Sequence, residues 1–147
     1  DLKPMSPTTT IHATTVSVKG RGVMIRGASG SGKSALALQL IAMGAELVSD
    51  DRTGLIKHDN RLIASPPDAI QGLIEARGIG ILALKYETEI PIYLLIDLDN
   101  DEPDRLPEIR YEEVMGVALR CLRRCDGPHF AASVYLMANM MDYPADD

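Results

Sequence analysis

The feature that most restricts the fold of this 147-residue chain is a glycine-rich segment at residues 27–34. It reads Gly27-Ala28-Ser29-Gly30-Ser31-Gly32-Lys33-Ser34 and matches the pattern G-x-x-x-x-G-K-[ST] at every specified position. Residues 22–26 before it are mostly apolar and β-prone, and residues 34–43 after it are rich in leucine and alanine. A strand, a glycine loop and a helix in this order bend backbone N–H groups around a phosphate chain. The segment therefore predicts a binding site for a nucleoside triphosphate.

Each residue type within this segment suits contact with one part of a bound Mg²⁺-nucleotide. The three glycines allow the backbone to approach the phosphates closely. Lys33 can reach the β- and γ-phosphates, and the hydroxyl of Ser34 can bind Mg²⁺. We expect all eight residues to contribute to the nucleotide site.

Composition and charge narrow the class of protein. The length predicts a single domain with its own core. A formal net charge of −6 argues against a general nucleic-acid binder, because no net positive field attracts the phosphate backbone. We find no signal peptide and no apolar run near 18 residues, so nothing indicates a membrane protein.

Cys121 and Cys125 are the only cysteines, and a spacing of four residues would place them on one face of a helix. His129 is near in sequence, but a structural zinc site needs four ligands and no fourth is evident. We therefore expect two free thiols in a reducing cytoplasm.

The first half of the chain predicts alternating strands and helices. Residues 14–19 and 22–26 form an expected β-hairpin. The helix over residues 34–43 is apolar almost all round, which predicts burial on every side, and Gly44 ends it. Residues 53–64 predict a second hairpin.

The second half of the chain is predicted in the same way. Residues 73–82 favour a strand interrupted by a bulge, and residues 89–98 favour a core strand. An acidic loop follows at residues 99–107. Residues 114–122 predict a strand, and residues 130–143 predict a C-terminal helix with a methionine stripe facing the core.

Acidic residues supply candidates for the second half of a phosphoryl-transfer site. Asp50 and Asp51 follow an expected strand at residues 47–48, at the sheet edge where ligands collect in open α/β folds. Adjacent strand residues point to opposite faces, so the backbone must turn between them if both serve one site. Glu75 is a third candidate to accompany Ser34 at the metal. These residues alone leave open which carboxylate accepts a proton.

Four motifs follow one another in a distinctive order. They are His12, the loop 27–34, the run Leu47-Val48-Ser49-Asp50-Asp51, and the signature Glu75-Ala76-Arg77-Gly78-Ile79-Gly80-Ile81. In this order, the sequence resembles the catalytic domain of bacterial HPr kinase/phosphorylase. The matching motifs span residues 11–82, and Asp104-Arg105 extends the match. The glycine loop is common to many families, whereas the acidic pair with the Glu75 signature is much more specific.

The resemblance implies an α/β fold, a P-loop kinase domain similar to the nucleotide-binding core of phosphoenolpyruvate carboxykinase. We expect one catalytic domain over residues 11–143, with residues 1–10 and 144–147 as flexible termini. Members of that family transfer the γ-phosphoryl group of ATP to a serine of the phosphocarrier protein HPr. Many also reverse the reaction by phosphorolysis. The implied cofactors are therefore ATP and Mg²⁺, and the implied partner is HPr.

Roles follow from the resemblance residue by residue. Ser34 and Glu75 become Mg²⁺ ligands, and Lys33 neutralises charge on the γ-phosphate. Asp51 becomes the proton acceptor, with Asp50 beside it in metal or proton chemistry. Two further residues complete the set: His12 would tune Asp51, and Arg105 would stabilise the transition state.

The sequence also departs from the long members of the family. It resembles a short form that consists of the catalytic domain alone. Residues 119–125 keep arginines but lack the prolines and glycine that the long form has in a stretch tied to dephosphorylation, so kinase activity is the firmer expectation. The resemblance further implies a cytoplasmic homo-oligomer, which is a hexamer in the family.

Two other functions are compatible with these motifs. One is a P-loop kinase of the same ancestry that acts on another small protein or on a metabolite, because acceptor choice depends on surfaces that the sequence does not label. The other is a regulatory module that binds nucleotide without transferring phosphate. The presence of the carboxylates and of His12 argues against this second alternative.

Overall fold

The computed structural model describes residues 8–142, which form one nine-stranded sheet, a separate two-stranded hairpin and two α-helices. The strands of the large sheet are β1 (Thr9–Ile11), β2 (Ala13–Val18), β3 (Arg21–Arg26), β4 (Glu46–Ser49), β5 (Thr53–His58), β6 (Arg61–Ser65), β9 (Ile90–Asp101), β10 (Arg110–Val114) and β11 (Val117–Arg124). The hairpin consists of β7 (Leu73–Ala76) and β8 (Gly80–Ala83). The helices are α1 (Lys33–Ala42) and α2 (Phe130–Met140), and a 3-10 turn, η1, covers Asp68–Ile70.

The long strand β9 organises the sheet, whose order is β1-β5-β6-β9-β3-β2-β4 with β11 and then β10 attached to β9. The start of β9 pairs antiparallel with β6, whereas its later residues pair parallel with both β3 and β11. Its near-continuous apolar run is typical of a strand buried on both faces. The carboxyl ends of β3, β9 and β11 therefore lie at one edge of the sheet, where open α/β folds bind their ligands.

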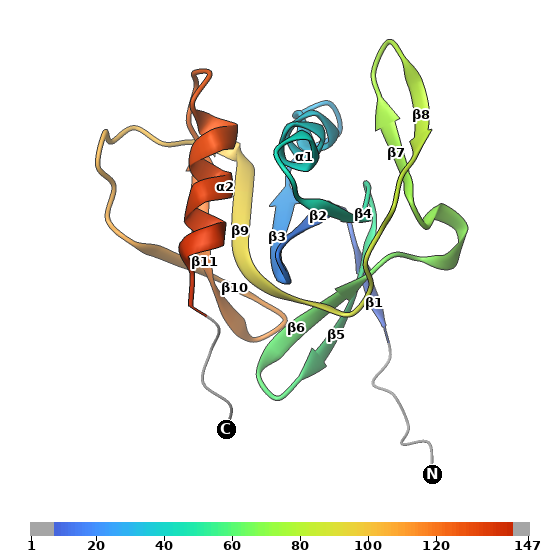
Figure 1. Cartoon of the computed structure of the whole chain (residues 1–147). Helices are drawn as coiled ribbons and strands as arrows, with labels where there is room; N and C mark the ends of the chain where they lie inside the picture. Colours follow the sequence, from blue (N-terminus) through green and yellow to red (C-terminus); the bar gives the residue numbers. More distant parts are fainter. Residues whose placement is uncertain (1–7, 143–147) are drawn as a thin grey trace.

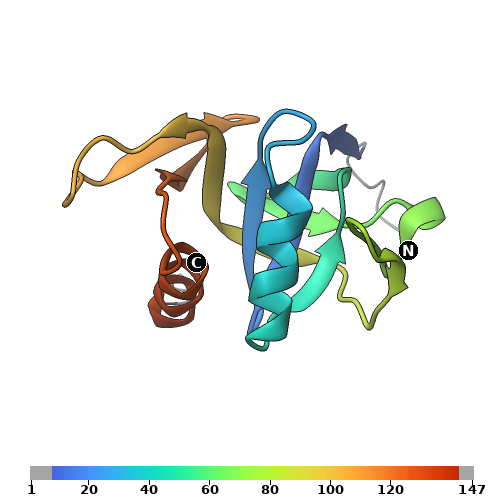
Figure 2. The same ribbon diagram turned by 90° about the horizontal axis from the view of Figure 1, so that it is seen from above.

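Both helices cover one face of the sheet, and α1 stands between α2 and the β7–β8 hairpin (Figures 1 and 2). A single apolar cluster joins the two helices to this face, and it includes Leu40 of α1 and Val134 of α2. A second cluster, which includes Met24, Leu55 and Leu95, fills the opposite face beneath the β5–β6 hairpin. The two clusters hold the P-loop strand β3 between them.

The structure confirms several predicted elements and corrects the burial of α1. The pairs β2–β3 and β5–β6 are the two expected hairpins, and α1 follows the glycine loop. The prediction that α1 is buried on every side is wrong. Leu36, Ala37 and Leu40 are buried, but Ala35 and Gln39 are exposed because the helix belongs to an outer layer with only one face against the sheet.

Two predicted strands are hairpins instead. The expected bulged strand over 73–82 folds back as β7 and β8, because Gly78 adopts a φ of 83° in the turn between them. The expected strand over 114–122 combines the end of β10 with most of β11, and Met115 and Gly116 form the intervening turn with φ of 50° and 79°.

The predicted boundaries also differ at three places. Thr9 and Thr10 were expected in a flexible terminus, but they pair with Leu55 and Gly54 as part of β1. The predicted acidic loop begins three residues early, because β9 continues to Asp101. Helix α2 ends at Met140. The remaining terminal predictions fall on residues 1–7 and 143–147, outside the described part of the chain.

Candidate active site

The glycine-rich loop joins β3 to α1 in a conformation that favours glycine at two positions. Gly30 and Gly32 have φ values of 82° and 104°. Left-handed backbone costs most other residues about 1–2 kcal/mol. Lys33 is buried, and its Nζ donates hydrogen bonds to the carbonyl oxygens of Gly27 at 2.9 Å and Ala28 at 3.3 Å. The lysine ammonium therefore lies within the loop, where a phosphate oxygen would compete with these carbonyl groups.

Asp50 is a buried carboxylate that connects three parts of the site. Its Oδ1 accepts hydrogen bonds from Ser34 Oγ at 2.6 Å and from Thr14 Oγ1 at 3.0 Å, and its Oδ2 accepts one from the backbone N of Glu75 at 3.0 Å. The carboxylate thus holds the start of α1, strand β2 and strand β7 together. Because the Ser34 hydroxyl points its proton toward Asp50 in this hydrogen bond, the lone pairs of the Ser34 oxygen remain available to a cation.

The backbone turns between Asp50 and Asp51, which brings two adjacent carboxylates to the same part of the structure. Asp51 has a left-handed φ of 67°, and its backbone N donates a hydrogen bond to Thr14 Oγ1 at 3.0 Å. Its Oδ1 lies 2.6 Å from Nε2 of His12, which sits between β1 and β2. The side chains of His12 and Asp51 are 51% and 59% exposed. Of the two neighbouring acids, one is therefore sequestered and the other is accessible to a substrate.

An open cavity of about 470 Å³ brings most of the predicted residues together. The loop and Lys33 form one part of its wall, and Asp51, Glu75 and Arg77 form another. Glu75 is exposed, and within residues 8–142 its carboxylate has no hydrogen-bond or ion-pair partner. The cavity therefore combines a phosphate-binding loop and a cation with two accessible carboxylates.

Arg105 is a predicted catalytic residue that neither lines this cavity nor, among the described residues, forms a hydrogen bond or ion pair with a residue that does. It lies in the exposed connection between β9 and β10, which extends away from the glycine loop at the left of Figure 2. The reason is local: Arg110 donates two hydrogen bonds to the carboxylate of Glu102, at 3.3 and 3.1 Å, and so closes the base of this loop.

Three residues at the site were not expected from the sequence. Thr14 lies within a β-branched run that looked like ordinary strand. Asp99 accepts a hydrogen bond from the backbone N of Ala28 at 2.9 Å, and Arg124 donates one to the carbonyl oxygen of Ser31. Asp99 belongs to the end of β9, which pairs with the P-loop strand β3, and Arg124 belongs to the end of β11, which pairs with β9. Their proximity to the loop follows from strand order, which no short sequence pattern encodes.

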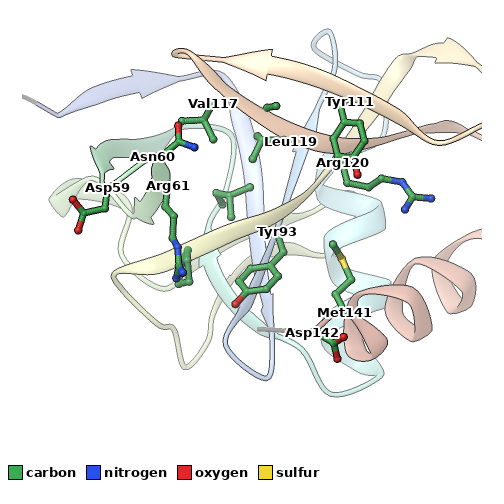
Figure 3. A pocket seen from close by; sticks show the side chains of 13 residues that line it. Asp59, Asn60, Arg61, Tyr93, Tyr111, Val117, Leu119, Arg120, Met141 and Asp142 are labelled. Carbon is green, nitrogen blue, oxygen red and sulfur yellow. The ribbon is translucent and has the colours of Figure 1, made fainter. Parts of the chain in front are cut away.

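A separate cavity of about 420 Å³ lies away from the loop, between the β5–β6 turn, β9, the β10–β11 hairpin and the residues after α2 (Figure 3). Its lining includes Arg61, Tyr93, Tyr111 and Arg120. None of the predicted site residues lines it. The chemistry of the side chains therefore distinguishes the candidate active site from this second cavity of similar size.

The prediction of two free thiols is confirmed, and the two cysteines do not lie on a helix. Cys121 is in β11 and Cys125 follows the end of this strand, and both are free thiols. Burial, followed by the nearby Glu112 carboxylate, raises the pKa of Cys121 from 9.0 to about 11. Cys125 is partly exposed, with its Sγ 3.8 Å from Nε2 of His129.

Comparison with known proteins agrees with this geometry. The model of the HPr Serine kinase C-terminal domain family matches residues 3–121. The chain belongs to this family. The HPr kinase/phosphorylase of Clostridium botulinum strain Eklund 17B is 32% identical to this chain, over 95% of the chain and 50% of the relative. That of Geobacillus kaustophilus is 38% identical, over 69% of the chain and 35% of the relative.

The chain thus spans half or less of the length of these curated relatives. A solved structure is similar over more of its length. The HPr(Ser) kinase/phosphatase from Coxiella burnetii is 26% identical and superimposes with a TM-score of 0.73, covering 88% of this chain and 93% of the Coxiella chain. The predicted family and the predicted α/β class are therefore confirmed. Within residues 8–142, neither helix is long and apolar enough to cross a membrane.

Proposed function

We propose that this chain is an ATP- and Mg²⁺-dependent protein serine kinase whose acceptor is the phosphocarrier protein HPr. The observation that carries this proposal is the His12–Asp51 pair beside the cavity that also contains Lys33. A carboxylate that is held by an imidazole and faces a phosphate-binding loop is suited to accept the proton of a hydroxyl group. The relatives, which are named HPr kinase/phosphorylase, supply the acceptor.

The residues of the loop fit a Mg²⁺-nucleotide complex. We assign the phosphates to residues 27–34, with the γ-phosphate near Lys33. Ser34 and Glu75 offer the oxygen ligands that Mg²⁺ prefers. The lone pairs of the Ser34 oxygen are available because its hydroxyl donates a hydrogen bond to Asp50, and the Glu75 carboxylate has no hydrogen-bond or ion-pair partner among the described residues. Bound Mg²⁺ neutralises charge on the phosphates.

Few protein ligands are typical for a Mg²⁺ ion that arrives with a nucleotide, because phosphates and water complete its shell. The described residues accordingly include no group of three or more His, Cys, Asp or Glu that could hold a metal without other ligands. We therefore expect the metal to bind with ATP.

In the proposed step, the serine Oγ of the acceptor attacks the γ-phosphorus of ATP, and the bond from this phosphorus to the β–γ bridging oxygen breaks. The hydroxyl proton passes to the carboxylate of Asp51, and ADP and phosphoserine are formed. In the reverse direction, an oxygen of inorganic phosphate attacks the phosphoserine phosphorus. Asp51 then returns its proton to the leaving serine oxygen, and the second product is pyrophosphate.

The two aspartates divide the work in this proposal. Asp50 is a positioning residue, because its oxygens already accept three hydrogen bonds and hold Ser34 in place. Asp51 transfers the proton, and His12 orients its carboxylate. Lys33 stabilises the negative charge of the transferring group. Arg105 would reach this group only after its loop moved, so we give it no part in the step.

We further propose that the protein works as a cytoplasmic homo-oligomer. ATP and HPr are both found in the cytoplasm. Helix α2 exposes the apolar side chains of Leu136 and Met140, which are 58% and 78% accessible and would favour contact with another subunit.

Incubation with γ-labelled ATP, Mg²⁺ and HPr tests the proposal. We expect label on HPr, and we expect Asp51→Asn to lower the rate at least about 100-fold with ATP affinity retained, as for loss of a general base. Lys33→Ala should lose both the transfer of label and the affinity for ATP. Asp59→Asn is the matched control, because Asp59 also has a positive φ and also pairs with a histidine, His58, but lies in the β5–β6 turn.

Two results would count against the proposal. An absence of label on HPr despite intact ATP binding would exclude HPr as the acceptor. A wild-type rate in Asp51→Asn would exclude the proposed proton transfer. Addition of phosphate to labelled phospho-HPr then tests the reverse reaction through the release of labelled pyrophosphate.

A further inference from the structure

A second crevice adjoins the glycine loop on the side of α1 that faces α2. It has a volume of about 260 Å³ and is lined by the first turns of α1, by Leu98 of β9 and by the segment 124–131, which connects β11 to α2. It shares Gly32, Ala35 and Gln39 with the active-site cavity. The two hollows therefore flank the N-terminal turns of α1, one lined by residues of β7 and the other by residues at the start of α2. Figure 1 shows α1 between these two elements.

The position of the catalytic groups gives a bound nucleotide its direction. Asp51 and Glu75 lie on the β7 side of α1, so the γ-phosphate must end there. A nucleoside triphosphate is a linear chain, and its other end must leave the loop in another direction. The β9 and β11 strands end on the opposite side of α1, parallel to the P-loop strand, and ligands of such sheets bind across the carboxyl ends of the strands.

The chemistry of this crevice suits a ribose and a base. Its walls combine polar groups with apolar side chains, which are Leu36, Leu98, Pro128 and Phe130, the only phenylalanine of the chain. Gln39 and Asp126 add polar groups that can accept hydrogen bonds from ribose hydroxyls or a base amino group. Small-molecule sites combine apolar walls with a few such groups, and typically measure about 300–1,000 Å³. This crevice is smaller because the phosphates lie outside it, in the loop.

Arg124 links the crevice to the loop. Its guanidinium lines the crevice and donates hydrogen bonds to the carbonyl oxygens of Ser31 in the loop and of Leu98, the latter at 3.1 Å. The wall of the crevice is therefore attached to the loop that binds the phosphates.

We infer that the crevice between α1 and the segment 124–131 binds the nucleoside part of the nucleotide whose phosphates occupy the glycine loop. This inference rests on the proposed function, because it uses the direction set by Asp51 and Glu75.

Cys125 provides a probe of this crevice. It lines the crevice and is partly exposed, whereas Cys121 is buried with a pKa raised to about 11 and reacts slowly at neutral pH. The experiment measures the rate of N-ethylmaleimide addition by mass spectrometry, with Mg²⁺-ATP, with inorganic tripolyphosphate and with neither. Tripolyphosphate occupies the loop but has no nucleoside. We expect saturating ATP to slow alkylation of Cys125 at least fivefold, and tripolyphosphate to leave the rate within twofold of the free protein.

Substitution of the same residue gives an independent measurement. Cys125→Trp fills the crevice and should raise the Kd for ATP at least tenfold while leaving the Kd for tripolyphosphate unchanged. Retained tripolyphosphate binding also shows that the variant is folded. Cys125→Ser is the matched control and should bind both ligands as the wild type does.

The outcomes separate this inference from the proposed function. ATP that binds without slowing the reaction of Cys125 overturns the inference and leaves the kinase proposal standing. Equal protection by tripolyphosphate also overturns it, because the loop alone would then account for the effect. Failure of the wild type to bind either ATP or tripolyphosphate refutes the nucleotide site itself.

Discussion

Replacing Thr14 by valine removes one hydroxyl group from between the two aspartates and preserves the shape of the side chain. This hydroxyl is fully buried, donates a hydrogen bond to Asp50 Oδ1 and accepts one from the backbone N of Asp51. Hydrogen bonds to a charged group contribute about 1.5–3 kcal/mol, and neutral ones about 0.5–1.5 kcal/mol. Loss of both should lower the free energy of unfolding by about 2–4 kcal/mol. For a domain of this size, Tm should fall by roughly 5–15 °C.

Thr14→Ser is the matched control, because it keeps the hydroxyl and loses only a methyl group, at about 1 kcal/mol. Urea unfolding followed by circular dichroism should place the serine variant between the wild type and the valine variant. The kinase rate should follow the same order, because Thr14 anchors the backbone of Asp51. A valine variant as stable as the serine variant would refute the view that this hydroxyl couples the two carboxylates.

Three further predictions concern other parts of the chain. In a Cys125→Ser background, the rate of Cys121 alkylation by iodoacetamide should rise with a midpoint near pH 11, because burial raises the pKa of this thiol to about 11; a midpoint at its ordinary value of 9.0 would contradict its burial. Gly32→Ala should lower the free energy of unfolding by about 1–2 kcal/mol in urea unfolding, since its φ of 104° costs alanine about that much, and an unchanged free energy of unfolding would show that the loop tolerates the strain. Hydrogen bonding from Arg110 lowers the pKa of Glu102 below its ordinary 4.5, so its stabilisation is present above pH 4.5 and is lost as the pH falls through the lowered value. The urea midpoints of wild type and Glu102→Gln should therefore differ at neutral pH and converge in acid, and a constant difference would argue against the ion pair.

Short-range patterns were sufficient to predict the strand, loop and helix around residues 27–34 and the turn between the two aspartates. The loop 27–34 and the adjacent pair Asp50-Asp51 are contiguous in sequence, and their geometry follows from backbone rules that act over a few residues. The requirement for a turn between the two aspartates was also visible, because strand residues alternate in direction. The structure shows that turn as the left-handed φ of Asp51.

Features that depend on tertiary context were not predicted. Thr14 looked like any β-branched strand residue, and only the pairing of β2 with β4 places it beside Asp50 and Asp51. The β7–β8 hairpin was mistaken for a bulged strand because Gly78 and Gly80 are compatible with both. The position of Arg105 depends on the closure of its loop by Glu102 and Arg110, two residues eight positions apart without a recognisable motif.

The left-handed backbone of Asp51 has a practical consequence for capturing the proposed complex with ATP and an acceptor serine. Asparagine tolerates this region of φ as aspartate does, unlike most side chains. Asp51→Asn should therefore fold without backbone strain, keep its hydrogen bond to Thr14 and lose the proton acceptor. Such a protein should hold ATP and the acceptor serine side by side without turnover, long enough for a ternary complex to be crystallised.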